Sequence, residues 1–331
     1  MKKKLALFLT AVLAMSMLAG CGGSEPAATD EPADAGVLKT GLALDTSVAK
    51  SVDGTAQADV TMAAVVVDGE GKIVSCVIDA AQTVVTFDET GKITTDMAAE
   101  FQTKNELGEG YGLKAASSIG KEWNEQAAGF AEYCVGKTAD EVLGIAADDA
   151  DVKASCTMYI GGFQKIVAEA VANAAVTGAQ EGDVLGLGVV TSIAKSTDAA
   201  EGAEGLAQAY TTVSAVIVDA DGKITSAAID AVQANVNFDA TGKITSDINA
   251  DVASKNELGE GYGMKGASSI GKEWNEQAAA YAANAVGKTA DDVNAIELTE
   301  GVPADADLAA SVTVHVTDFN TVLTKAVANA K

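Results

Sequence analysis

The chain contains two copies of one sequence unit, and this repeat limits its fold more than any other feature. The segment Lys104–Gly112, which reads KNELGEGYG, recurs unchanged at Lys255–Gly263. A length of 331 residues also suits about two domains. We therefore expect the same domain twice, at residues 37–180 and 181–331, with each copy able to fold on its own.

Within each copy, the pattern of apolar residues predicts strands first and helices afterwards. Stretches rich in β-branched residues indicate strands, and turn residues such as Asp68 and Gly69 separate them. Trp123, Ala127 and Phe130 recur at helical spacing and indicate a helix with one apolar face. The expected strands of the first copy lie at residues 62–68, 72–80, 83–87, 92–95 and 155–160, and its longer helices at residues 119–134 and 163–174. This order favours an α+β fold, in which each copy is an antiparallel sheet with packed helices.

The charge of the chain excludes some partners and some kinds of site. There are 47 acidic residues against 22 basic ones, which gives a net charge of −25. Nucleic acid and anionic lipid surfaces require dense positive charge, so we expect neither as the main partner. His315 is the only histidine, which excludes a Ser-His-Asp triad in each copy and a multi-histidine metal site. We therefore assign no catalytic and no metal-binding residue.

The N-terminus has the features of an export signal. A run of lysines precedes the apolar stretch Leu5–Leu18, which is too short to span a bilayer comfortably. The segment Leu18–Cys21 resembles a bacterial lipobox, whose cysteine carries the lipid. We expect residues 1–20 to be a signal peptide, Cys21 to be lipidated and residues 21–36 to be a flexible tether. This predicts an extracytoplasmic lipoprotein, with the membrane as a partner through its lipid anchor.

Aromatic residues recur at two places in both copies. Tyr111 and Tyr262 lie in the repeated glycine-rich loop, where a tyrosine can stack on a planar ligand or cover the core. Trp123 and Trp274 lie on the apolar faces of their helices, so we expect them to pack in the core.

Two polar positions also recur. Asp79 and Gln82 match Asp230 and Gln233 in the second copy, and we expect each pair to end a strand. Such residues can hydrogen-bond a ligand, although an aspartate at a strand end commonly stabilises a turn.

The cysteines, in contrast, are confined to the first copy. Cys76, Cys134 and Cys156 have small apolar counterparts in the second copy, so a site required twice cannot depend on them. Buried thiols explain them better than a functional site, and one disulfide between two of them stays open.

Near the end of each copy, an aspartate is followed by a threonine at the same spacing. These residues are Asp151 and Thr157 in the first copy, and Asp307 and Thr313 in the second. This arrangement resembles the motif of the FMN-binding domain family, which includes surface lipoproteins of extracellular electron transfer. In that family, the threonine carries FMN through a phosphoester bond.

The resemblance implies a flavin-carrying role for the neighbouring residues. It places Thr157 and Thr313 at the attachment point, with Ser155 and Ser311 close enough to contact the same FMN. It also implies that Tyr111, Tyr262, Asp151 and Asp307 belong to the cofactor site. The implied function is an electron carrier with FMN as cofactor and a redox protein as partner, rather than a turnover enzyme.

Two other classes of function stay open. A surface module that binds a partner or a ligand without a cofactor needs only the anchor, the tether and the repeats. A solute-binding lipoprotein of a transporter has a suitable length, but its lobes normally interleave chain segments, whereas these copies follow one another.

Overall fold

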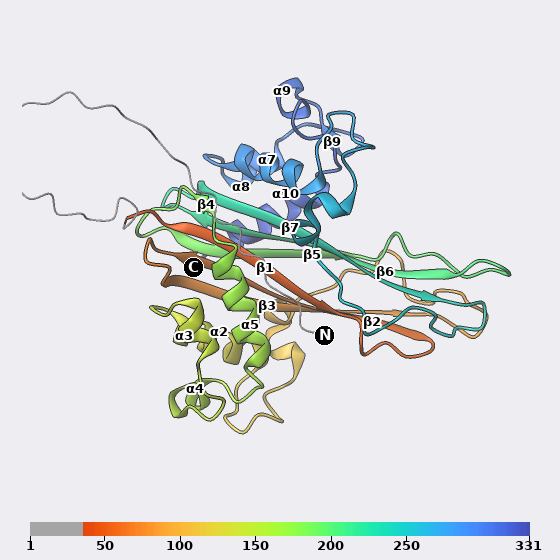
Figure 1. Ribbon diagram of the computed structural model, residues 1–331, viewed down its shortest axis with the longest axis horizontal. Coiled ribbons are helices and arrows are strands. Elements are labelled where there is room, and N and C mark those ends of the chain that lie inside the picture. The colour runs from red at the N-terminus through yellow and green to blue at the C-terminus, as the bar shows by residue number, and fades with distance from the viewer. Residues whose placement is uncertain (1–35) are drawn as a thin grey trace, which may run out of the picture. The chain divides into compact units, whose positions relative to one another are not determined.

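The computed structural model describes residues 36–331, and two similar halves follow each other along the chain (Figure 1). The signal peptide, Cys21 and all but the last residue of the tether lie outside the described residues. The first half contains β1 (Lys39–Ser47), β2 (Thr55–Val67), β3 (Ile73–Thr86), α1 (Lys104–Leu107), α2 (Trp123–Cys134), α3 (Ala139–Leu143), α4 (Ala150–Ser155), α5 (Gly161–Ala172) and β4 (Val176–Thr177). The second half contains β5 (Val184–Ser192), β6 (Gly205–Val218), β7 (Ile224–Phe238), α6 (Lys255–Leu258), α7 (Trp274–Ala285), α8 (Ala290–Asn294), β8 (Leu298–Thr299), β9 (Val302–Pro303), α9 (Ala306–Ala309) and α10 (Thr317–Asn329).

Each half builds an antiparallel sheet from its long strands, which confirms the predicted α+β class. The order is β3-β2-β1-β4 in the first sheet and β5-β6-β7 in the second. A tight turn joins β2 to β3, because Asp68 Oδ1 accepts hydrogen bonds from the backbone N–H groups of Glu70 and Lys72. Gly71 completes this turn with a φ of 77°, a conformation that favours glycine. Asp219 and Gly222 repeat the arrangement between β6 and β7.

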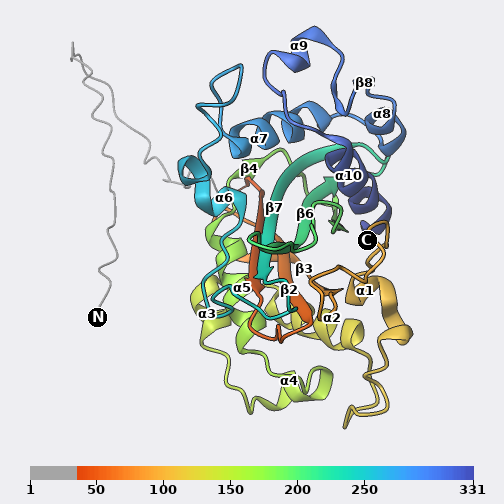
Figure 2. The same ribbon diagram turned by 90° about the vertical axis from the view of Figure 1, so that its right-hand side faces the viewer.

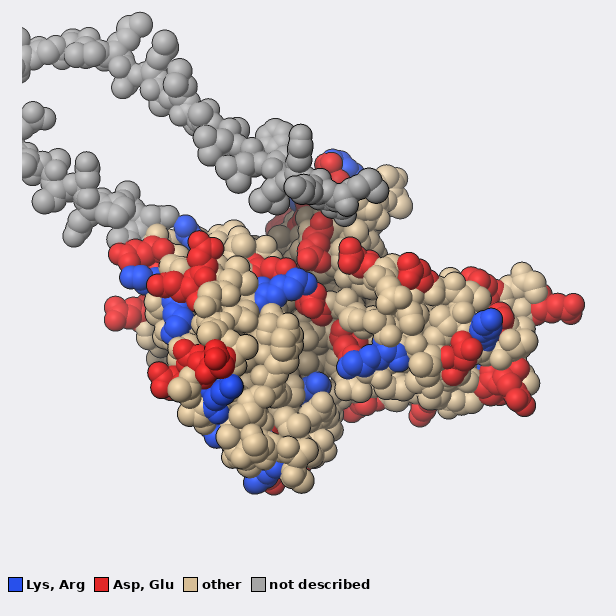
Figure 3. Space-filling model, turned by 60° about the horizontal axis from the view of Figure 1, so that its bottom comes forward, with Lys and Arg blue, Asp and Glu red and all other residues tan. Residues whose placement is uncertain are grey.

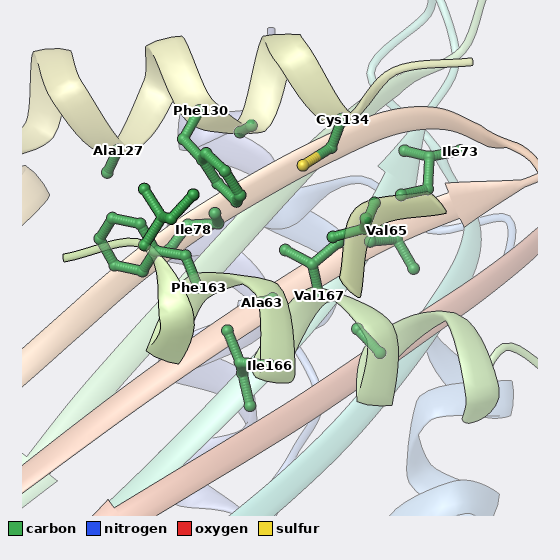
Figure 4. Close-up of a cluster of buried hydrophobic side chains, with 14 of the residues drawn as sticks. Ala63, Val65, Ile73, Ile78, Ala127, Phe130, Cys134, Phe163, Ile166 and Val167 are labelled. Carbon is green, nitrogen blue, oxygen red and sulfur yellow. The ribbon is translucent and has the colours of Figure 1, made fainter. Parts of the chain in front are cut away.

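Helices cover one face of each sheet. In the first half, apolar side chains of α2 and α5 meet those of β2 and β3 (Figure 4), and the shared cluster includes Phe130, Phe163 and Ile78. Helix α5 packs very closely on β1 at Gly41, where a Cβ atom would lie 2.0 Å from Ala170 O. In Figures 1 and 2, the helices α2 to α5 lie on one side of the strands and α7 to α10 on the other.

The opposite faces of the two sheets pack against each other. One buried cluster joins Leu44 and Met62 of the first half to Leu187 and Val213 of the second. Another contains the stacked rings of Phe87 and Phe238, with centroids 3.8 Å apart. Each half therefore has a helix-side core of its own and buries the other face of its sheet against the other half. The described residues accordingly belong to one compact unit. Independent folding of each copy stays a prediction.

The structure departs from the expected elements in three places. The predicted second hairpin is present only in part: its first strand belongs to β3, and the return segment meets it through the Phe87–Ile93 bridge and the hydrogen bond from Thr94 N–H to Thr86 O. The strand expected at residues 155–160 is absent, since Ser155 ends helix α4, which the carboxylate of Asp149 caps, and residues 156–160 form no strand. The strands β1 and β5 were not predicted.

Candidate functional site

The two motif threonines have the same local geometry in both halves. The backbone N–H and the hydroxyl of Thr157 both donate to Gln126 Oε1, at 2.9 and 3.2 Å. Thr313 makes the same two contacts with Gln277 Oε1, at 2.7 and 3.2 Å. Gln126 is itself buried and donates from Nε2 to Lys121 O. In the first half, these hydrogen bonds hold the loop after α4 on α2. In the second half, they hold the loop after α9 on α7. They account for both threonines without a cofactor.

The other motif residues lie nearby but converge on no common point. Asp151 and Asp307 are exposed in the first turns of α4 and α9, whose caps are Asp149 and Asp305. Ser155 is half-buried and donates to Val152 O, and Ser311 is half-buried at the end of α9. The pockets described below are lined by other residues. Flavin attachment therefore stays a prediction that rests on the motif.

The recurring tyrosines contact lysines of the chain itself. Lys104 Nζ lies 4.7 Å from the ring centre of Tyr111, and Lys255 Nζ lies 4.6 Å from that of Tyr262. Lys255 is buried, and burial lowers its pKa to about 8. Trp123 and Trp274, which lie next to these two lysines, are buried in the core, as predicted. Each tyrosine ring thus makes a cation–π contact with a lysine of the chain and packs against the core of its own half.

Two pockets occur at matching positions between the halves. The β1 pocket, of about 650 Å³, lies between β1 of the first half and α7 and β7 of the second. The β5 pocket, of about 420 Å³, lies between β5 of the second half and α2 and β3 of the first. Among wall positions that lie 151 residues apart, five carry the same residue in both pockets, which are Asp230, Asn256, Glu257, Asn275 and Ala279 in the β1 pocket and Asp79, Asn105, Glu106, Asn124 and Ala128 in the β5 pocket. The repeat therefore supplies the same polar groups to a pocket twice.

A buried aspartate stands in each pocket wall. Asp79 and Asp230 lie inside β3 and β7 rather than at strand ends, which corrects the expectation from the sequence. They are 6% and 4% exposed. Asp230 Oδ1 accepts from the backbone N–H groups of Ala231 and Asn256, at 2.7 and 3.0 Å. Burial raises the pKa of both carboxyls to about 6, although these hydrogen bonds oppose the shift.

Asparagine side chains complete each polar wall. Asn256 Nδ2 donates to Ile229 O at 3.0 Å, and Asn105 makes the equivalent contact with Ile78 O. The Oδ1 atoms of Asn124 and Asn275 are buried and have no hydrogen-bond partner among the described residues. An unpaired buried acceptor costs about 1–3 kcal/mol. Because the terminal torsion of asparagine is soft, its amide can turn toward a donor in the pocket.

These pockets could not be predicted, because each combines residues from both halves. The signal available in the sequence was the repeated set of Asp79, Asn105 and Glu106, of which only the aspartate was singled out. Within residues 36–331, no cluster of three or more histidine, cysteine or acidic side chains could hold a metal ion. In the same part of the chain, no helix has the length and apolar character needed to cross a membrane. No protein-family model, curated protein or solved structure matches the chain.

Proposed function

We propose that this chain is a non-catalytic binding protein whose β1 and β5 pockets take small polar solutes between its two halves. The observation that carries the proposal is the same aspartate, asparagine and glutamate set in both pocket walls. Ligand pockets for small molecules commonly measure about 300–1,000 Å³ and combine apolar walls with a few converging polar groups. The β1 pocket agrees, because apolar residues such as Leu42 and Ala282 line it together with the polar set.

The charge of the β1 pocket favours solutes that donate hydrogen bonds or carry positive charge. Among the described residues, its lining includes Asp230 and Glu257 but no lysine and no histidine. The wider surface has the same bias, since acidic side chains outnumber the dispersed lysines on the face drawn in Figure 3. A phosphate or carboxylate would be repelled there.

Binding fits the chemistry of the pocket better than catalysis. Asp230 is held by two backbone N–H groups, so it is oriented as an acceptor. The amides of Asn256 and Asn275 have no acid–base chemistry near neutral pH. An enzyme of acyl or phosphoryl transfer would require a nucleophile with its base, or positive charge, at this place.

The cellular setting of the proposal comes from the N-terminus. A lipid on Cys21 would display both pockets outside the cytoplasm, with the membrane as anchor. A binding lipoprotein of this kind then meets solutes before they reach the membrane.

An FMN-carrying electron carrier is the second candidate. The observation in its favour is that Thr157 and Thr313 keep one geometry in both halves, with Thr157 exposed at the surface. Bound FMN would supply the redox chemistry, and the threonine hydroxyls would first have to leave Gln126 and Gln277. Absorbance of purified protein in the flavin bands, lost in the T157A/T313A variant, would support this candidate.

The proposal is tested by filling one pocket at a time. Ala279 and Ala128 are exposed positions of α7 and α2 that line the β1 and the β5 pocket. A library of small polar solutes is screened by thermal shift, and hits are measured by calorimetry on wild type, A279W and A128W. We expect one class of solute to lose binding in a pocket-filling variant that keeps the wild-type melting temperature. Solutes that bind all three proteins equally would contradict the proposal.

A further inference from the structure

We propose that the β1 pocket holds a primary ammonium group of its solute between the backbone carbonyl of Leu44 and the carboxylate of Glu257. This inference rests on the proposed function of the same pocket and adds the class of its ligand. The evidence comes from the other half of the chain, where a lysine of the protein occupies the equivalent place.

In the second half, Lys325 of α10 supplies that ammonium group. Its Nζ lies 2.7 Å from Glu106 Oε1 and 3.1 Å from the backbone oxygen of Val189 on β5. The ammonium thus joins an acidic residue of one half to the free edge of the first strand of the other. A charged group with two such acceptors is a favourable arrangement for a primary amine.

The repeat identifies the matching place in the first half. Asn329 Nδ2 of α10 donates to Leu187 O on β5 at 2.9 Å, and Asn173 Nδ2 after α5 donates to Leu42 O on β1 at 3.1 Å. Val189 lies two residues after Leu187, and Leu44 lies two residues after Leu42. Their carbonyls therefore point to the same outward edge as the carbonyls of Leu187 and Leu42. Glu257 is the repeat equivalent of Glu106, and both Leu44 and Glu257 line the β1 pocket.

The lysine itself is replaced by an acid in the first half. Lys325 lies one helical turn before Asn329, and Glu169 lies one helical turn before Asn173. The two acceptors are therefore kept, while the lysine of this helix position is not. Burial raises the pKa of Glu169, and the negative charges of Asp45 and Glu257 act in the same direction.

One lysine is close by, but it leaves negative charge in excess. Lys165 pairs with Asp45 at 2.5 Å and with Glu169 at 3.8 Å. Three carboxylates, those of Asp45, Glu169 and Glu257, thus share one ammonium group. In the second half, Val190 replaces Asp45, and Lys325 balances Glu106. A cationic solute would restore this balance at the β1 pocket.

The space at this place suits a short, extended amine. A further cavity of about 600 Å³ shares Leu44 and Glu257 with the β1 pocket and adds Asp251 to its wall. A diamine can place one ammonium group at Glu257 while its chain continues into either cavity.

The test uses the full-length protein and putrescine, a four-carbon diamine, in calorimetry at low ionic strength. We expect saturable binding to wild type, no comparable binding of the matching butanediol, and no displacement by magnesium chloride. Glu257→Gln should weaken putrescine binding about fivefold or more, because it removes a charged acceptor. Glu132→Gln on the exposed face of α2 removes the same charge at a residue that lines neither pocket and should leave binding unchanged.

Two exchanges between the halves test the equivalence directly. Glu169→Lys copies Lys325 into the first half, so we expect it to occupy the site and reduce putrescine binding at least about tenfold. Lys325→Glu should create a second putrescine site in the β5 pocket. Equal binding of putrescine by wild type and Glu169→Lys would overturn this inference, as would equal binding of butanediol.

The outcome also separates this inference from the proposed function. If A279W blocks neutral solutes while putrescine binds nowhere, the ammonium site is wrong and the pocket is still a ligand site. If Glu257→Gln leaves putrescine binding unchanged, the ammonium site is wrong, whereas neutral solutes that bind wild type, A279W and A128W alike would contradict the proposed function.

Discussion

The stacked pair of Phe87 and Phe238 gives the sharpest test of whether the two halves share one core. Phe87 is 4% exposed and Phe238 is fully buried, and their rings are inclined by only 9°. We would change each residue to alanine, alone and together, and measure the free energy of unfolding.

The expected magnitudes follow from this geometry. Truncation of a buried phenylalanine to alanine costs about 3–5 kcal/mol, so each single variant should lose stability in this range. An aromatic pair contributes about 0.5–1.5 kcal/mol beyond its buried area. The double variant should therefore lose less than the sum of the single losses by about that amount, because the second truncation removes a partner already lost.

Phe319 provides the control for this cycle. It is buried in the helix-side core of the second half, where it contacts Trp274 and Tyr281 rather than Phe87. Combining Phe319→Ala with Phe87→Ala should give losses that add within about 0.5 kcal/mol.

The assay is urea unfolding followed by tryptophan fluorescence. Trp123 reports on the first half and Trp274 on the second, so variants with one tryptophan replaced by phenylalanine separate the two signals. We expect one transition with the same midpoint in both. Two separate transitions, together with additive losses for Phe87 and Phe238, would refute a shared core.

Three further predictions concern packing, titration and the anchor. Gly41→Ala should cost about 1–3 kcal/mol in thermal unfolding, because its Cβ would meet Ala170 O, whereas Gly36→Ala, with nothing within 4 Å, should change nothing. The folded-state pKa of Asp79 and Asp230, about 6, lies above the pKa of an unfolded aspartate. Ionisation of these carboxyls therefore destabilises the folded state as the pH rises from about 4 to about 6. Relative to the D79N/D230N variant, the wild type should lose roughly 2–3 kcal/mol per carboxyl across this range in urea titrations, and parallel pH profiles would disprove it. Cys21→Ala should release the protein from the membrane fraction, and normal anchoring of that variant would exclude lipidation of Cys21.

Much of the fold could be predicted because its signals are local. The turn at Asp68 and Gly71 and the apolar face around Phe130 are set by residues close in sequence, and both are confirmed. Strand β1 was missed because Gly41 interrupts its apolar pattern, and that glycine is required by the close approach of α5. Here tertiary packing, rather than strand propensity, decides the residue.

The candidate site could be predicted only in part. The recurrence of Asp79 as Asp230 pointed to the correct pocket wall, but its position inside a strand depends on how far β3 and β7 extend. The meeting of Leu44 with Glu257 depends on the packing of the two halves, which no local pattern encodes. The threonine of the motif, in turn, has a structural role visible only in three dimensions, which is the bond of Thr157 to Gln126.

Native mass spectrometry of the mature protein, purified from its own host, tests most directly whether the pockets between the halves are the functional site. We predict a non-covalent small-molecule adduct that A279W loses and that the T157A/T313A variant keeps. A covalent FMN-sized mass, present in A279W and absent from T157A/T313A, would contradict this account and establish the flavin carrier instead.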